Sequence, residues 1–122
     1  MPRYVTFFTY TGEAWARMLE RPEDRAEAAR TAIEATGGRM DSFYWMMGRA
    51  DGFAVYSVPD EISAAGLLAA VASSGRVARV ETFQVLDMTE GRRALERARE
   101  LSRTYRPPGA PSDWREEYDA LG

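Results

Sequence analysis

The amino-acid sequence predicts an α+β domain in which a four-stranded antiparallel sheet carries helices on one face. Four segments have the aromatic and β-branched composition of strands: residues 3–10, 40–47, 53–58 and 76–86. Segments with helical periodicity separate the first strand from the second and the third strand from the fourth. The order β-α-β-β-α-β is that of the split βαβ, or ferredoxin-like, unit, which leaves one sheet face without helices.

The joins between these elements carry residues typical of turns and helix ends. We expect a helix opened by Thr11-Gly12, then a second helix with Pro22 in its first turn and a stop at Gly37-Gly38. The second and third strands form a hairpin through residues 48–52, which end in the favoured turn dipeptide Asp51-Gly52. The helix before the fourth strand begins at Pro59-Asp60.

The 122 residues are enough for one domain, which we place at residues 1–103. Its last helix is expected to be capped by Thr89. Residues 104–122 follow as a proline-rich connector and a short helix that Ser112 can cap. Because apolar side chains recur on one side of that helix, we expect it to dock on the domain or on a neighbouring subunit: Trp114, Tyr118 and Leu121.

The composition excludes several kinds of chemistry. The chain has no Cys and no His, and all sixteen of its basic residues are Arg. Thiol and Schiff-base catalysis, the Ser-His-Asp triad, and haem or Fe–S ligation by these side chains are therefore ruled out. The Asp and Glu spacing predicts no metal site, and no Gly-x-Gly-x-x-Gly turn is present for a dinucleotide, so we expect no cofactor.

The net charge and the hydropathy of the chain indicate which classes of partner to exclude. The net charge is −3, and the Arg residues alternate with Asp and Glu as on solvated helix faces, so we expect no nucleic-acid partner. No apolar run approaches the roughly 20 residues that span a bilayer, so we expect no membrane partner and a cytoplasmic location.

The sheet face without helices is expected to be aromatic. Strand alternation divides each strand into two sets. We expect the uncovered set to be Tyr4, Thr6, Phe8 and Tyr10 in the first strand, Met40, Ser42, Tyr44 and Met46 in the second, Ala54 and Tyr56 in the third, and Arg79, Glu81 and Phe83 in the fourth. Such a face exceeds the apolar patch that a monomer exposes, which predicts a homodimer or higher even oligomer, a hydrophobic ligand, or both.

Residues 4–90 resemble the GYD-domain family. The resemblance is carried by Phe8-Thr9-Tyr10-Thr11, Arg25, Gly37-Gly38, Phe43-Tyr44, Gly48, Asp51, Pro59-Asp60 and Gly75-Arg76-Val77. It implies a ferredoxin-like protein of the dimeric α/β-barrel type, and the family has no generally agreed activity. The family's Gly-x-Tyr-Asp signature reads Gly48-Arg49-Ala50-Asp51 here, so alanine replaces an aromatic residue.

Two sets of residues are candidates for function. The polar set could carry acid–base chemistry: Asp51 and Glu81 as bases, Arg79 as an anion anchor, and Tyr10 as a hydrogen-bond donor. Simpler interpretations are a turn role for Asp51, an ion pair between Arg79 and Glu81, and tyrosines that fill an interface. The apolar set could bind a flat hydrophobic ligand: Tyr4, Phe8, Tyr44, Trp45, Met46, Tyr56 and Phe83.

Two functions remain open at this point. The first is a cofactor-free enzyme that binds a small hydrophobic or aromatic, polyketide-like metabolite beside the sheet and isomerises, cyclises or oxygenates it. The second is a non-catalytic homo-oligomeric module that binds a metabolite or a partner protein. The bulky second strand and the vacated position at Ala50 favour the enzyme.

Overall fold

The computed structural model describes residues 1–121, and of residues 117, 118, 120 and 121 only the backbone. The chain divides into two units, Met1–Val85 and Leu86–Gly122. The domain boundary predicted after residue 103 stays a prediction. Along the chain the elements are β1 (Arg3–Tyr10), α1 (Gly12–Glu20), α2 (Arg25–Ala35), β2 (Arg39–Trp45), β3 (Gly52–Ser57), α3 (Glu61–Ser73), β4 (Val77–Val85), α4 (Met88–Leu101) and α5 (Trp114–Leu121).

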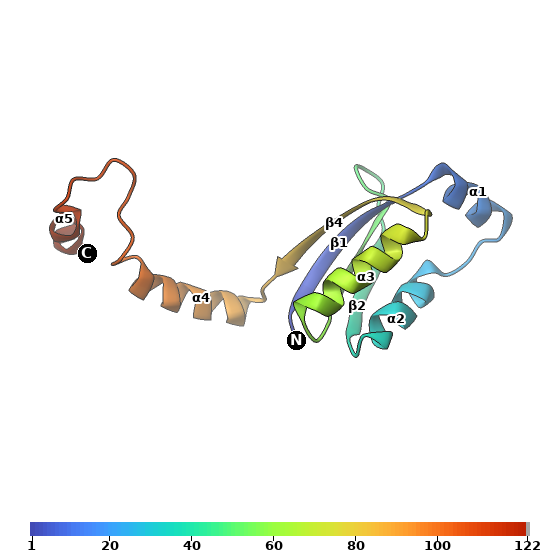
Figure 1. Ribbon diagram of the computed structural model, residues 1–122, viewed down its shortest axis with the longest axis horizontal. Helices are drawn as coiled ribbons and strands as arrows, with labels where there is room; N and C mark the ends of the chain where they lie inside the picture. The colour runs from blue at the N-terminus through green and yellow to red at the C-terminus, as the bar shows by residue number, and fades with distance from the viewer. Residues whose placement is uncertain (122) are drawn as a thin grey trace. The chain divides into compact units, whose positions relative to one another are not determined.

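The first unit is an α+β sandwich of two layers. Its four strands form one antiparallel sheet in the order β2-β3-β1-β4, with β1 paired to β3 on one side and to β4 on the other. Helix α2 lies over β2 and α3 over β4, on the same face of the sheet (Figure 1). The predicted α+β class and four-stranded antiparallel sheet are confirmed, and the strand order is compatible with the ferredoxin-like unit.

The buried residues of β1 face the helices. Its even-numbered side chains are buried and its odd-numbered ones only half-buried, in strict alternation. Two groups of buried residues lie under the helices: one centres on Tyr56 and Val58 with Ile33 of α2, the other on Phe8 and Tyr10 with Ala14 of α1.

The expected orientation of β1 and β3 is therefore wrong. Tyr4, Phe8, Tyr10 and Tyr56 lie on the helix-covered face, and the set that includes Phe7 and Phe53 lies on the other. Three of the four aromatic residues of β1 are in its even-numbered set and only Phe7 is in the other, so the more aromatic set is the one that the helices cover. The deciding contacts come from elsewhere in the chain: the Tyr56 hydroxyl is 2.8 Å from Thr6 Oγ1 beneath the helices.

An irregularity in β2 places Met40 and Phe43, three residues apart, on the same face of the sheet. The register with β3 shifts between Met40 and Ser42, which leaves Asp41 unpaired in the ladder. Because the extra residue reverses the alternation, Met40 and Phe43 both pack against the helix-side core while Tyr44 stands opposite Phe53 on the other face. The expectation that Met40 shares a face with Tyr44 is wrong for this reason.

Two of the helix starts lie where the sequence predicts them, and two differ. Thr11 and Asp60 cap α1 and α3 through their side chains, at the positions where the sequence predicts helix starts. Helix α2 begins at Arg25 with Asp24 as its cap, so Pro22 lies before the helix rather than in its first turn. Helix α4 is capped by Asp87, whose side chain and that of Glu90 form a capping box, and not by Thr89.

The second unit contains α4 and α5. The Trp114 side chain is buried, with 9 % exposed, and the Arg115 guanidinium lies 5.8 Å from its ring centroid. The side chains of Tyr118 and Leu121, which complete the predicted stripe, are outside the described residues. Docking of the tail stays a prediction. Among the described residues, no helix is both long enough and apolar enough to span a membrane.

Candidate functional site

A cavity of about 560 Å³ lies between the sheet and the helices of the first unit. Its floor is the helix-covered face of the sheet, and α1, α2 and α3 supply its walls. On α2 the lining residues are small, because Ala28, Ala29 and Ala32 face it. Leu67 and Leu68 of α3 line the opposite side. Small side chains on one helix leave space that a larger residue would fill, and the volume lies in the usual range of small-molecule sites.

A chain of three hydroxyl groups crosses the floor of this cavity. Thr6 Oγ1 of β1 lies 2.8 Å from Tyr56 Oη of β3 and 2.8 Å from Thr82 Oγ1 of β4. The three residues are neighbours across the sheet because Thr6 pairs with Thr82 in the register. Burial raises the pKa of Tyr56, although its hydrogen bonds with the two threonines act in the opposite direction. Tyr56 therefore stays protonated at neutral pH and is available as a hydrogen-bond donor.

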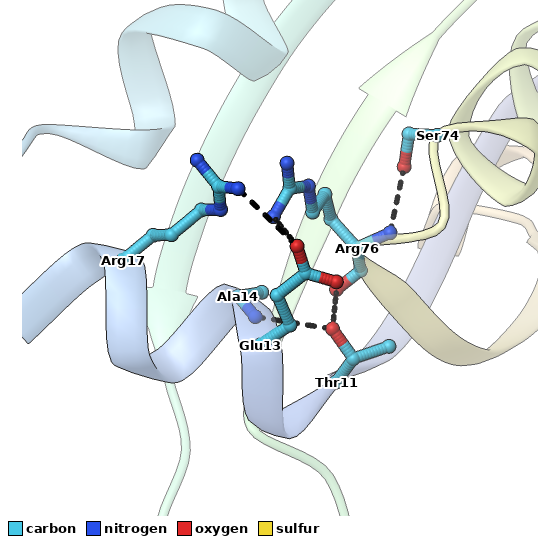
Figure 2. A network of polar contacts seen from close by, with 6 residues as sticks. All are labelled: Thr11, Glu13, Ala14, Arg17, Ser74 and Arg76. Carbon is cyan, nitrogen blue, oxygen red and sulfur yellow. Dashed lines mark hydrogen bonds and ion pairs between the residues drawn. The ribbon is translucent and has the colours of Figure 1, made fainter.

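The end of the cavity where β1 stops and β4 starts is cationic. Arg17 of α1, Arg25 at the start of α2 and Arg76 before β4 all line it. Figure 2 shows the guanidinium groups of Arg17 and Arg76 converging on the Glu13 carboxylate, at 3.3 and 2.9 Å from its Oε1 atom. Arg25 pairs with Glu23 at 3.2 Å.

Backbone contacts hold this end together. The Thr11 N–H donates to the Arg76 carbonyl at 3.0 Å, and the Thr11 hydroxyl accepts from the Ala14 N–H, so the α1 cap lies beside the start of β4 (Figure 2). The Arg76 N–H in turn donates to the Ser74 hydroxyl at 3.2 Å. A helix cap and a turn thus hold the backbone of α1 beside the residue that precedes β4, from which Arg17 and Arg76 both extend.

Tyr10 lies at the same end. It is 8 % exposed, and burial raises its pKa while the adjacent Arg25 side chain acts to lower it through polar contact and charge. Its ring is tilted at 55° to that of Phe8, with centroids 5.3 Å apart, and meets Trp15 edge-on at 5.5 Å, and these contacts hold the ring in the wall. Because the pKa is raised, the phenol is a hydrogen-bond donor at neutral pH and not a base.

Asp51 has a structural position outside the cavity. Its Oδ2 atom accepts a hydrogen bond from the Tyr10 N–H at 2.9 Å, and its own N–H donates to the Phe8 carbonyl at 2.9 Å. Pairing of β1 with β3 ends at Phe8 and Gly52. The carboxylate thus supplies the acceptor that the next strand residue would have provided, and Asp51 is not among the residues that line the cavity.

Replacing Asp51 with alanine is expected to lower the free energy of unfolding by about 1–2 kcal/mol, because the Tyr10 N–H loses its acceptor in a partly buried place. Urea denaturation measures the change. Asp51→Asn keeps an acceptor oxygen and is the matched control, with at most a small loss expected. Equal losses in the two variants would show that the carboxylate charge matters, and not its hydrogen bond.

Glu81 and Arg79 lie on the opposite face of the sheet from the cavity. The Glu81 carboxylate is 3.3 Å from Arg79 Nη2 and 4.0 Å from Arg49 Nη2. This geometry fits the ion-pair interpretation of the sequence motif. The structure does not bring these two residues together with Tyr10 in the cavity, so the four candidate catalytic residues do not form one site. A catalytic role for any of them stays a prediction.

The candidate ligand-binding residues are likewise divided between the two faces. Phe8 and Tyr56 line the cavity, and Tyr4 stacks on Tyr56 with ring centroids 6.0 Å apart. Trp45 meets Trp15 of α1 edge-on at 5.1 Å, and the Met46 N–H donates to the Asp51 carbonyl in the hairpin. Tyr44 and Phe83 belong to the uncovered face.

The uncovered face carries an aromatic row across all four strands, formed by Tyr44, Phe53, Phe7 and Phe83. Neighbouring ring centroids along the row are 5.5, 5.9 and 6.3 Å apart. Tyr44 and Phe83, at its two ends, are more than half exposed. Ion pairs flank the row: Arg79 and Arg49 with Glu81, and Arg3 and Arg39 with Asp41.

Several cavity residues were not identified from the sequence as site residues. Thr6 is a polar residue in the middle of an aromatic strand, which is a usable signal for a buried hydroxyl partner. Arg17 is an i,i+4 neighbour of Glu13 within α1, but Arg76 carries no such signal, because it is 63 residues from Glu13 and only the fold brings them together. Among the side chains that the structure describes, no three acidic groups gather closely enough to hold a metal ion.

Comparison with known proteins agrees with this geometry at the level of the family. None of the curated proteins compared with the chain matches it. The family model described as the GYD domain matches residues 4–95, which include the whole sheet, the cavity and the start of α4. Because this match spans most of the chain, the protein belongs to the GYD-domain family.

Proposed function

We propose that this protein binds a small, mainly hydrophobic molecule that presents a hydrogen-bond acceptor, in the cavity between the sheet and the helices. The observation that carries the proposal is the cavity itself: about 560 Å³, with small alanines along α2, leucines along α3 and a hydroxyl chain on its floor. Apolar walls with a few placed polar groups are the usual composition of ligand sites.

The hydroxyl chain supports an acceptor on the ligand. Three hydroxyl groups hold three protons, and the two hydrogen bonds at Thr6 use two of them. When Thr82 donates to Thr6 and Thr6 donates to Tyr56, the remaining proton is on Tyr56, which lines the cavity. A ligand carbonyl or hydroxyl beside Tyr56 accepts this proton and completes the chain.

Binding without catalysis is the better supported of the two functions. Acid–base chemistry needs a base within reach of the substrate. Asp51 holds the end of β1 and Glu81 lies on the other face of the sheet, while the one carboxylate among the cavity-lining residues, Glu23, pairs with Arg25. The enzyme interpretation would need a base from a residue outside this set.

We also propose that the aromatic row is covered by the same face of a second copy of the chain. A two-fold contact places identical surfaces together, and this face is complementary to itself because it carries both signs of charge: Arg79 beside Glu81 at one place and Arg3 beside Asp41 at another. A row of four aromatic side chains supplies the apolar centre that such interfaces have.

The binding proposal is tested with a matched pair of probes, 2-acetylnaphthalene and 2-ethylnaphthalene, which differ in the carbonyl group. Isothermal titration of the full chain is expected to show binding of the ketone at micromolar to sub-millimolar concentration. Ala32→Phe fills the cavity from α2 and is expected to abolish binding of both probes, whereas Ala35→Phe, on the same helix but outside the lining, leaves binding unchanged.

Tyr56→Phe distinguishes binding in the hydrophobic cavity from the hydrogen bond that Tyr56 is proposed to donate to the ligand. Without the Tyr56 hydroxyl, the ketone is expected to bind about as weakly as the hydrocarbon, a loss of about three- to tenfold for one hydrogen bond. Absence of binding of either probe to the unmodified chain, or equal binding in Ala32→Phe, would contradict a ligand site in this cavity.

A further inference from the structure

The polar groups of the cavity are not spread evenly. The hydroxyl chain occupies the middle of the floor, at Thr6, and the aliphatic walls of Ile33 and Leu67 lie around it. The charged lining residues gather at the end where Tyr10 pairs with Val77. Two sets of contacts connect these residues. The Arg25 side chain interacts with the Tyr10 hydroxyl. Arg76, next to Val77, and Arg17 both form ion pairs with Glu13.

This end holds more positive charge than its own carboxylates neutralise. Arg17 and Arg76 share a single carboxylate, and both reach the same oxygen atom, Glu13 Oε1 (Figure 2). Arg25 has Glu23 as its partner. The nearby Asp51 carboxylate acts on Tyr10 through its charge, but it neither lines the cavity nor forms an ion pair with these arginines. The cavity-lining groups and their partners therefore amount to three cations against two carboxylates.

The donors at this end suit a planar anion. An arginine fork presents two parallel N–H groups, and carboxylates accept such pairs at both oxygens. The Tyr10 hydroxyl is protonated at neutral pH because burial raises its pKa, so it adds a neutral donor beside Arg25. Glu13 shows that a carboxylate fits between the two guanidinium groups, each of which donates to its Oε1 atom through one nitrogen.

We propose that the ligand of this cavity is an amphipathic carboxylic acid, with its apolar body over the sheet and its carboxylate at Arg17 and Arg76 in place of, or beside, Glu13. The inference rests on the proposed binding function and adds the chemical class of the ligand. The half-exposed arginines keep the carboxylate in contact with water, while the alanine and leucine walls take up the chain or ring behind it.

The test compares decanoate with decanamide, which have the same apolar chain and differ in charge. Titration at pH 7 is expected to show decanoate binding about five- to tenfold more tightly than the amide, the range for a charge-assisted hydrogen bond discounted for exposure. Both are expected to compete with 2-acetylnaphthalene and to lose binding in Ala32→Phe. Decyl phosphate is a third probe. Its head group is also negatively charged, but it is not planar as a carboxylate is.

Two substitutions are expected to move the acid preference in opposite directions. Arg76→Gln removes one fork and is expected to reduce the preference for decanoate over decanamide to less than about threefold. Glu13→Gln removes the competing carboxylate and is expected to tighten decanoate binding several-fold and to raise the preference for decanoate over decanamide. Arg30→Gln on α2 loses the same charge outside the lining and is the matched control.

The outcomes separate the inference from the function on which it rests. If decanamide binds as tightly as decanoate and both occupy the cavity, the cavity is a hydrophobic site and the carboxylate assignment is wrong. If decyl phosphate binds far more tightly than decanoate, the head group is a phosphate and the assignment is also wrong. If no probe binds, the proposed function itself fails. An increase in decanoate affinity in Glu13→Gln is the result that a purely structural role for this ion pair does not produce.

Discussion

Replacing Gly38 with alanine is expected to lower the free energy of unfolding by about 3 kcal/mol or more, the range for a change that forces packed backbone apart. A Cβ atom at this position would lie 2.2 Å from the Ser57 carbonyl oxygen and 3.1 Å from Val58 Cα. Both are backbone atoms of the segment at the end of β3, so no side-chain rotation relieves the contact. Urea denaturation of the full chain measures the loss.

Gly66→Ala is the matched control for this prediction. Gly66 lies within α3, and a Cβ atom there would meet nothing within 4 Å. Alanine loses less conformational entropy on folding than glycine, so this variant is expected to be more stable by about 0.5–1 kcal/mol. Similar stabilities of Gly38→Ala and Gly66→Ala would show that the Gly38 backbone and the end of β3 do not approach as closely as described.

The second large effect concerns the uncovered face. The unmodified chain is expected to sediment as a dimer at micromolar concentration, and Phe7→Asp, in the middle of the aromatic row, is expected to convert it to a monomer. A carboxylate placed between Phe53 and Phe83 would be desolvated without a partner when two such faces meet. Sedimentation velocity gives the mass in each case.

Two further variants make this result interpretable. Leu19→Asp introduces the same charge at an apolar residue of α1 that is 80 % exposed, away from the row, and is expected to leave the dimer intact. The Phe83 side chain is more than half exposed in the single chain. Phe83→Asp is therefore expected to break the dimer without lowering the melting temperature of the monomer. A monomeric unmodified chain, or a dimeric Phe7→Asp, would contradict the assignment of this face to a second copy.

The candidate site was only partly accessible from the sequence. Tyr56 and Phe8 were identified as ligand-binding residues, and both line the cavity, although on the face opposite to the one expected. Asp51 was recognised as important in the hairpin, and its contact with the Tyr10 N–H explains why without placing it in a site. Glu81 and Arg79 were correctly paired with each other, but neither the cavity nor its cationic end was apparent.

Local signals account for what the sequence determined by itself: the order of elements, the sheet class, and helix starts at Thr11 and Asp60. Each depends on interactions within a few residues, namely a side-chain cap or an alternation of apolar positions. Only the tertiary structure decided which face of β1 meets the helices, because alternation divides the strand into two sets without showing which set the helices cover, and the choice depends on partners such as Tyr56, fifty residues away. The convergence of Arg17 and Arg76 on Glu13 has the same origin, since antiparallel pairing of β1 with β4 brings the start of α1 beside the start of β4, and no local pattern records that approach.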